Sequence, residues 1–227
     1  MITENVANIR NRISLACSKA GRDPQEITLV AVTKMVGTEY IRKAIEAGIS
    51  DIGENYVQDI RSKYQELKDF KLRWHFIGHL QTNKVKYIAE WISMIHSVDS
   101  MHLGMEISKW MTRLNRTLPI LIEVNTSGEV SKYGINPENT GTLLRDLSKL
   151  PNISVQGLMT MAPFVTDPEE VRPFFSRLRQ LRDELQKEGY QLPVLSMGMT
   201  NDFEIAIEEG ATIVRIGTAI FGERKLK

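Results

Sequence analysis

The residue with the clearest chemical potential is Lys34, which directly follows the apolar segment 27–33. Partial burial and neighbouring positive charge favour the neutral amine of a lysine, which can attack an aldehyde and form an imine. The alternative for a single lysine at the end of a strand is a solvated charge at the rim of the fold. Residues elsewhere in the chain must decide between these two interpretations.

Two glycine-containing segments near the C-terminus share a pattern that suits phosphate binding. Residues 196–201 are Ser-Met-Gly-Met-Thr-Asn, and residues 215–218 are Arg-Ile-Gly-Thr. Each segment joins a small hydroxyl residue and a glycine to the predicted start of a helix, where free backbone N–H groups can converge on a phosphate. Two ordinary turns between a strand and a helix are the alternative interpretation.

An aldehyde that also carries a phosphate group is pyridoxal 5'-phosphate (PLP), so the lysine and the two segments predict this cofactor, held as an imine on Lys34. Arg215 would then lie across the cofactor ring and face the pyridine nitrogen. A permanent cation there opposes protonation of the nitrogen, and an unprotonated ring is a poor electron sink. Alternatively, Arg215 pairs with Glu208, Glu209 or another acid at the rim.

Other polar residues are weaker candidates. Asn55 or Tyr56 could reach the lysine side of the ring, although an asparagine at this point also suits a plain helix cap. Lys132 could reach the phenolic oxygen of the ring, and a solvated lysine is the alternative. His75 and His79 do not have the helical context of a metal-ligand pair, so we expect packing or capping roles and no metal site.

The candidate residues follow short apolar segments that alternate with helical patterns along the chain. These segments are mostly continuous and rich in β-branched residues, which is typical of parallel strands covered on both faces. The eight predicted strands span residues 27–33, 49–52, 72–77, 94–98, 119–125, 153–159, 193–196 and 212–216. Lys34 and the two glycine-containing segments come at the carboxyl ends of the first, seventh and eighth strands, where α/β barrels build active sites and bind phosphate.

Eight strand–helix units predict a closed barrel in which the first and eighth strands are neighbours. The chain ends about ten residues after the eighth strand, too soon for a full last helix. A helical pattern over residues 3–20 precedes the first strand and can fill the vacant position. The sequence therefore predicts an α/β fold, a single (β/α)8 TIM-type barrel forming one domain over residues 1–227, with an N-terminal helix closing the ring.

The bulk composition limits the expected partners and compartment. The 29 basic and 28 acidic residues leave a formal net charge of +1, so no overall field favours nucleic acid or an anionic membrane. The first twenty residues mix charges with apolar positions, unlike a signal peptide or a membrane span. The single cysteine, Cys17, allows no internal disulfide, so we expect a cytoplasmic protein. A fairly polar surface without a second domain favours a monomer.

The sequence also resembles a known family, the pyridoxal phosphate homeostasis proteins, which are similar to the N-terminal barrel domain of alanine racemase (PLP fold type III, barrel domain only). The resemblance runs the length of the chain. It is carried by the segments AVTK at 31–34, GENYVQ at 53–58, WHFIGHLQ at 74–81 with Asn83-Lys84, SKYG at 131–134, GLM at 157–159, SMGM at 196–199 and VRIGTAIFG at 214–222.

The resemblance implies roles for individual residues. Lys34 would be the imine lysine, and Arg215 the partner of the ring nitrogen. The implied phosphate ligands are Ser196, Gly198, Gly217 and Thr218. Two segments depart from the family pattern: residues 35–37 are Met-Val-Gly where many relatives carry a proline, and residues 200–202 are Thr-Asn-Asp in place of a more common serine and aspartate.

Three functions are compatible with these residues. The first is a PLP carrier or buffer without catalytic residues, which serves intracellular PLP homeostasis and passes the cofactor to apo PLP-dependent enzymes; the family resemblance implies this role. The second is a fold-type III enzyme such as an amino-acid racemase or decarboxylase. Racemases need acid/base groups on both faces of the cofactor, and no residue is placed opposite Lys34 by its spacing, so at most weak racemase-like activity is expected. The third is a barrel enzyme for phosphorylated sugars.

Overall fold

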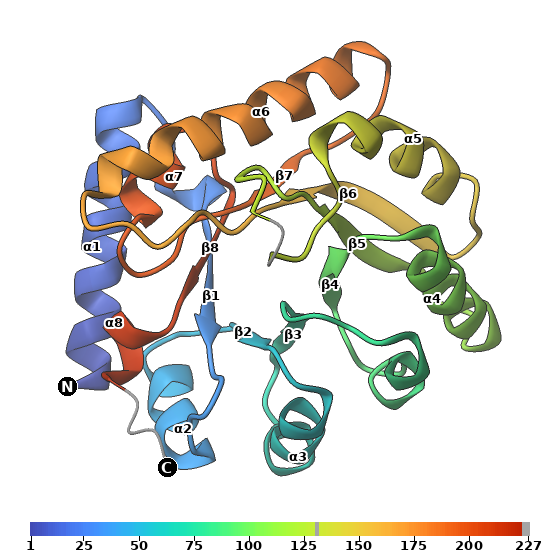
Figure 1. The fold of residues 1–227 in the computed structure, drawn as a ribbon. Coiled ribbons are helices and arrows are strands. Elements are labelled where there is room, and N and C mark those ends of the chain that lie inside the picture. Colours follow the sequence, from blue (N-terminus) through green and yellow to red (C-terminus); the bar gives the residue numbers. More distant parts are fainter. Residues whose placement is uncertain (130–131, 224–227) are drawn as a thin grey trace.

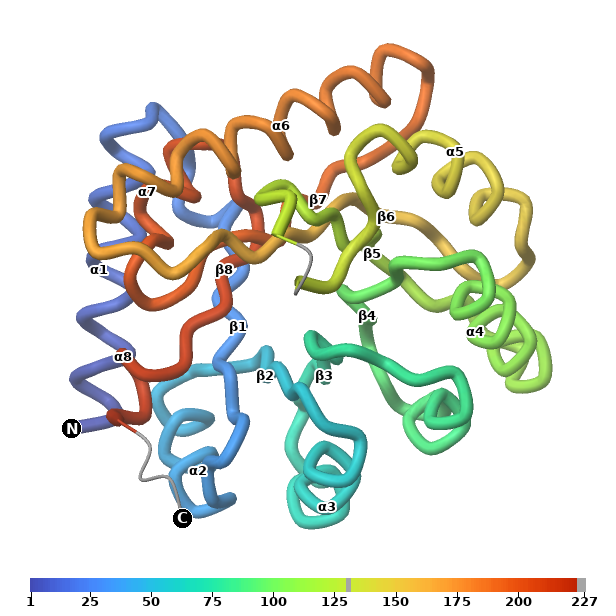
Figure 2. The backbone as a smooth tube through the Cα atoms, in the orientation of Figure 1, coloured from blue at the N-terminus to red at the C-terminus, as the bar shows by residue number. Residues whose placement is uncertain are grey.

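The computed structural model describes residues 1–129 and 132–223, and within them eight parallel strands close into a barrel in sequence order. Figure 1 shows the helices arranged around this barrel, and Figure 2 traces the same path through the backbone. The strands are β1 (Thr28–Val32), β2 (Asp51–Glu54), β3 (Arg73–Phe76), β4 (Met94–Val98), β5 (Leu118–Glu123), β6 (Ile153–Met159), β7 (Val194–Ser196) and β8 (Ile213–Ile216). The predicted fold class is confirmed, and the predicted strand boundaries differ from the observed ones by at most two residues.

Helices and short 3-10 turns connect the strands. The helices are α1 (Ile2–Ala20), α2 (Thr38–Glu46), α3 (Val57–Leu67), α4 (Met101–Arg113), α5 (Pro137–Leu147), α6 (Arg172–Lys187), α7 (Phe203–Glu208) and α8 (Thr218–Phe221), and the 3-10 turns are η1 (Pro24–Glu26), η2 (Thr82–Tyr87) and η3 (Pro168–Val171). No helix among these is long and apolar enough to cross a membrane.

Helix α1 covers the seam of the barrel, as the sequence predicted. Its buried face is formed by Val6, Ile9, Ile13, Ala16 and Cys17, which recur at helical spacing. The helix ends at a glycine in the left-handed conformation, as is common at helix C-termini. It packs against α2, α7 and the short α8, so it occupies the position that a full last helix would take (Figure 1).

The register of β1 with its two neighbours decides which loops meet at the mouth. Val32 pairs with Gly53 of β2, and Ala31 pairs with Ile216 of β8. The residues that follow these pairs therefore leave the barrel together at its carboxyl end. This arrangement brings Lys34, Asn55 and Gly217 to one side of the mouth.

Lys34 lies in a tight turn whose next residue has an unusual backbone conformation. The amide of Val36 donates to the carbonyl of Thr33, and Met35 has φ of 59°. A left-handed conformation costs a residue with a side chain about 1 kcal/mol, and glycine avoids that cost. The first family departure, at residues 35–37, therefore coincides with local backbone strain.

We expect Met35→Gly to raise the free energy of unfolding by roughly 0.5–1 kcal/mol, because Met35 is half exposed and little packing is lost. Urea unfolding of both proteins measures the change. Met105→Gly, at another exposed methionine but within α4, is the control and should destabilise by about 1 kcal/mol. A loss of stability in Met35→Gly would contradict the assignment of strain.

Candidate functional site

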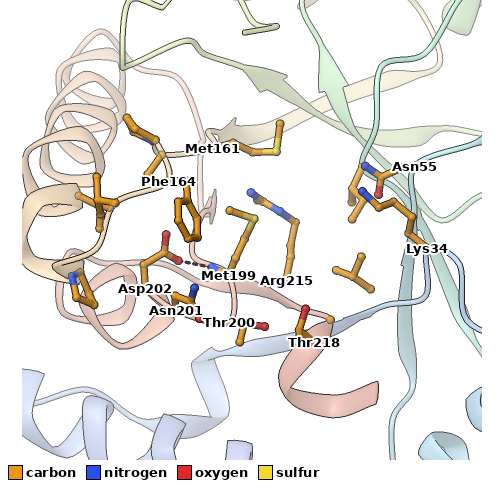
Figure 3. A pocket seen from close by; sticks show the side chains of 18 residues that line it. Lys34, Asn55, Met161, Phe164, Met199, Thr200, Asn201, Asp202, Arg215 and Thr218 are labelled. Carbon is orange, nitrogen blue, oxygen red and sulfur yellow. Dashed lines mark hydrogen bonds between the residues drawn. The ribbon is translucent and has the colours of Figure 1, made fainter. Parts of the chain in front are cut away.

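A cavity of about 310 Å³ opens at the carboxyl end of the barrel and gathers most of the predicted site residues. Its wall includes Lys34, Asn55, Arg215, Gly217 and Thr218. Figure 3 shows Lys34 and Asn55 on one side, Thr200, Asn201 and Asp202 on the other, and Arg215 between them. Lys34 is half buried and faces this shared cavity, so it is not a solvated charge at the outer rim. The structure therefore brings together the amine and the loops after β7 and β8.

The loop after β7 contributes Thr200 and Asn201 to the cavity wall, and not the predicted Ser196 and Gly198. Thr200 and Asn201 line the cavity beside Gly217 and Thr218 of the next loop. The amide of Ala219 donates to the Thr200 hydroxyl at 3.3 Å, which ties the two loops together. The two loops therefore meet at the cavity, where the hydroxyl of Thr200 forms part of the wall.

Ser196, a predicted phosphate ligand, lies behind the wall of the cavity. Ser196 is completely buried and does not line the cavity. Its hydroxyl lies within 2.9 Å of His96 Nδ1 and accepts from Arg215 Nη1 at 2.6 Å. Both hydrogen-bonding directions of the hydroxyl are thus used inside the barrel. Ser196 is thus a partner of Arg215, and its proposed contact with a phosphate stays a prediction.

Gly198 also lies behind the cavity wall. It has φ of 93°, and a Cβ there would come within 2.6 Å of the Ala206 Cβ and 2.9 Å of the Phe203 Cα. The close approach of α7 therefore accounts for this glycine without a ligand. Its proposed contact with a phosphate stays a prediction.

The strand ends that carry Lys34 and Asn55 are anchored by a buried ion pair. Glu54 is completely buried and pairs with Lys63 from α3. Lys63 Nζ also donates to the Thr33 carbonyl at 2.7 Å, and Glu54 Oε2 accepts from the Asn55 amide at 2.9 Å. One pair thus holds the residue before the lysine and the backbone of the asparagine. Sequence reasoning missed both members.

Arg215 is almost fully buried at the base of the cavity. Its Nη1 donates to Ser196 Oγ and its Nη2 donates to the Thr160 carbonyl at 2.9 Å. Burial lowers the pKa of Arg215 to about 10, and the charges of Glu123 and Asp202 oppose that shift. The guanidinium therefore stays charged at neutral pH.

The alternative that Arg215 pairs with Glu208 or Glu209 is wrong. Glu208 ends α7 and Glu209 directly follows it; both carboxylates bind Arg172, and Glu208 also binds Lys19.

A second cavity of about 620 Å³ adjoins the first and shares Asn55, Ile77 and Met161 with it. His79 lines it and stacks on Tyr133 with ring centroids 4.3 Å apart. His75 is buried inside the barrel, away from His79. Within residues 1–129 and 132–223 no group of histidine, cysteine and acidic residues could hold a metal ion.

Lys132, a further candidate from the sequence, lines neither cavity. Lys132 pairs with Glu129 at 3.1 Å. The first residue of its motif, Ser131, lies outside the described residues.

Glu123, which ends β5 and lines the second cavity, was also missed by the sequence analysis. Burial raises the pKa of Glu123 to about 7; the charge of Asp99 adds to this shift and Arg215 opposes it. Its position at the carboxyl end of a strand was a usable signal, because barrel enzymes place functional side chains there.

The raised pKa of Glu123 predicts a pH-dependent stability. The folded form binds the proton of Glu123 more tightly than the unfolded form does. The contribution of this proton to the free energy of unfolding is therefore fully present below about pH 4.5 and is lost as the pH rises through about 7. The free energy of unfolding of Glu123→Gln, relative to that of wild type, should be roughly 2–3 kcal/mol higher at pH 8 than at pH 4.5. Urea unfolding at both pH values measures this, and Glu90→Gln, at an exposed site, is the control. Parallel pH profiles for wild type and Glu123→Gln would contradict the raised pKa.

Comparison with known proteins places this geometry in context. The sequence matches the family model "Alanine racemase, N-terminal domain" over residues 5–225. It is 51% identical over 223 residues to the pyridoxal phosphate homeostasis protein of Aquifex aeolicus, covering 98% of each chain. It is 42% identical to the protein of that name from Pseudomonas aeruginosa, covering 98% of this chain and 96% of the relative. The solved structure of PipY from Synechococcus elongatus with PLP bound matches with a TM-score of 0.86 at 33% identity, covering 98% of this chain and 100% of that chain.

Proposed function

The chain belongs to the pyridoxal phosphate homeostasis protein family, built on the alanine racemase N-terminal domain, and from this membership we propose that it binds PLP and serves PLP homeostasis as a carrier or buffer. The single observation that carries the proposal is the convergence of Lys34 and Arg215 with the loops after β7 and β8 on one cavity. An amine from one side and hydroxyl and amide groups from the other match the two ends of a phosphorylated aldehyde.

The chemistry of the donor set fits PLP. Lys34 offers the amine for the aldehyde, and Asn55 lies beside it. Thr218, Gly217 and Thr200 lie around the part of the wall that would hold the phosphate. The volume of about 310 Å³ is at the small end of ordinary ligand pockets, which suits a compact cofactor.

When bound, PLP supplies an electrophilic carbonyl and a ring that can withdraw electrons. Lys34 would hold the cofactor covalently, and the permanent charge of Arg215 would keep a proton off the ring nitrogen. This residue set favours retention of the cofactor over carbanion chemistry. The names of the relatives likewise describe homeostasis.

A second candidate function, a weak racemase-like activity, is favoured by one observation. Glu123 lies on the adjoining cavity, and its pKa of about 7 suits proton transfer near neutral pH. Exchange of the α-proton of free amino acids for deuterium, followed by NMR, tests this candidate. We expect no exchange above the rate of free PLP, and exchange that Glu123→Gln abolishes would establish catalysis.

The partners and compartment form part of the proposal. Apo PLP-dependent enzymes are the proposed recipients, the cytoplasm is the proposed location, and a monomer is the proposed state. The near-neutral charge balance supports neither nucleic acid nor membrane as a partner.

Cofactor binding is tested directly by titrating the purified protein with PLP and reducing the complex with borohydride. We expect about one equivalent of PLP per chain, visible absorbance, and a mass adduct on the peptide that contains Lys34. Glucose 6-phosphate, in place of PLP, serves as the probe for a sugar-phosphate site. A protein that binds this sugar phosphate and forms no adduct with PLP would refute the proposal.

A further inference from the structure

A row of buried polar side chains crosses the barrel interior from its base to the cavity. It consists of Asp51 in β2, His75 in β3, His96 in β4, Ser196 in β7 and Arg215 in β8, and each is at most 4% exposed. We call these residues the interior chain. Burying so many polar groups is costly unless every one of them finds a partner.

Consecutive members of the interior chain are hydrogen-bonded. The distances are 2.6 Å from Arg215 Nη1 to Ser196 Oγ, and 2.9 Å for each of the three remaining links, Ser196 Oγ to His96 Nδ1, His96 Nε2 to His75 Nδ1, and His75 Nε2 to Asp51 Oδ1. The two histidines take no part in the proposed contacts with PLP.

The two ends of the interior chain fix the direction of its protons. Although burial raises the pKa of Asp51, hydrogen bonds from His75, Arg73 and Ser50 outweigh it and lower the pKa to about 2, so the carboxylate only accepts. His75 Nε2 must therefore carry a hydrogen. At the other end a guanidinium only donates, so Ser196 Oγ accepts from Arg215.

The middle links then have one consistent solution. Ser196 keeps its own hydroxyl hydrogen, and within the interior chain the acceptor for this hydrogen is His96 Nδ1. A neutral His96 has its hydrogen on Nε2 and donates it to Nδ1 of His75. Burial holds the pKa of His96 well below its usual range, and the charge of Arg215 acts in the same direction. Every donor in this order meets an acceptor, and both imidazoles are neutral.

The reverse order fails at Ser196. If His96 Nδ1 carried the hydrogen, the serine oxygen would accept from both His96 and Arg215. The hydroxyl hydrogen of Ser196, which is fully buried, would then have no acceptor within the interior chain. The structure thus contains a one-way hydrogen-bond order from Arg215 to Asp51.

We propose that Ser196, His96 and His75 are positioning residues that fix the guanidinium of Arg215 at the base of the cavity. The order makes the serine oxygen a pure acceptor toward Nη1, while the Thr160 carbonyl holds Nη2. The chain is fixed at its far end, where Asp51 is bound by Arg73 and Ser50. The consequence for PLP rests on the proposed function: a guanidinium held in place is a more constant partner for the ring nitrogen than a mobile one.

The first test needs no cofactor. Long-range 1H–15N NMR of the unliganded protein reports the hydrogen on each imidazole nitrogen. We expect both His75 and His96 to carry a single hydrogen, which lies on Nε2 in each ring. A hydrogen on Nδ1 of His96 would overturn the proposal.

The second test follows the release of PLP from wild type, Ser196→Ala and Asp51→Asn. Ser196→Ala removes the link beside Arg215, and Asp51→Asn replaces the charged acceptor of His75 at the base of the barrel with a weaker, neutral one. We expect each variant to release PLP about tenfold faster than wild type and to shift the pH profile of the visible absorbance. Ser97→Ala is the matched control, since Ser97 is the next residue in β4 and its buried hydroxyl has no partner within the described residues. It should leave release and spectrum unchanged.

The two tests separate the possible failures. Wild type that does not bind PLP refutes the proposed function, whereas the NMR result still decides the order of the interior chain. Folded Ser196→Ala and Asp51→Asn proteins that release PLP at the wild-type rate would refute the positioning role. An effect of Ser97→Ala equal to theirs would also refute it.

Discussion

Replacement of Lys34 by alanine is expected to abolish the borohydride-stable adduct with PLP and to weaken binding on the order of a hundredfold or more. Lys34 is the amine that faces the cavity from the β1 side, and the proposed contacts at Thr218, Gly217 and Arg215 would hold the cofactor only non-covalently. Peptide mapping after reduction, together with a PLP titration followed by absorbance, measures both effects. The visible absorbance of the bound cofactor should be lost with the adduct.

Two controls separate covalent attachment from charge and from fold. Lys34→Arg keeps a cation at the cavity, but a guanidinium cannot serve as the amine, so it should also lack the adduct. Lys84→Ala removes a lysine from the adjoining cavity and should leave the adduct intact. Lys34→Ala should retain the wild-type free energy of unfolding within about 0.5 kcal/mol. An adduct that persists in Lys34→Ala on another peptide would refute the assignment of the lysine.

The fold and one side of the site follow from the sequence because parallel barrels obey simple geometric rules. Continuous apolar segments marked the strands, and a closed parallel barrel brings the ends of its first and last strands together. The order of the strands therefore predicts that Lys34, Gly217 and Thr218 share one cavity, as they do in the structure. The prediction needed only the order of the strands and the point at which each one ends.

Ser196 illustrates what such reasoning leaves undecided. It ends β7, and whether its side chain points into the barrel or toward the cavity depends on the strand boundary to within one residue. The hydrogen bonds to His96 and Arg215 join residues 100 and 19 positions apart, and no spacing rule pairs them. The hydroxyl of this loop that lines the cavity belongs to Thr200.

The pairing of Glu54 with Lys63 was equally hidden from the sequence. Lys63 lies on the buried face of α3 with Ile60 and Leu67, where a lysine looks like an exception to the apolar pattern. Its partner ends β2, and only the docking of the helix on the barrel brings the two together. Charged residues on a buried face therefore signal that a partner exists, without identifying it.

This pair leads to the largest expected change in stability. Lys63→Met leaves the fully buried Glu54 carboxylate without its cation, and loss of one partner from a buried pair costs about 3–5 kcal/mol. The Thr33 carbonyl also loses a donor, so the turn that carries Lys34 should loosen. We expect a lower urea midpoint with an unchanged slope, and slower formation of the PLP adduct in the folded variant.

A double variant distinguishes an unpaired charge from lost packing. Lys63→Met combined with Glu54→Leu removes both charges, and an apolar pair of similar volume often matches a buried ion pair in stability. The double variant should therefore recover more than half of the lost stability. Adduct formation should stay slow, because the Thr33 carbonyl still lacks its donor and the Asn55 amide has now lost its acceptor as well. Lys68→Met, at an exposed lysine just after α3, should cost less than about 1 kcal/mol. Equal losses in the single and double variants would show that shape, and not charge pairing, stabilises this corner of the barrel.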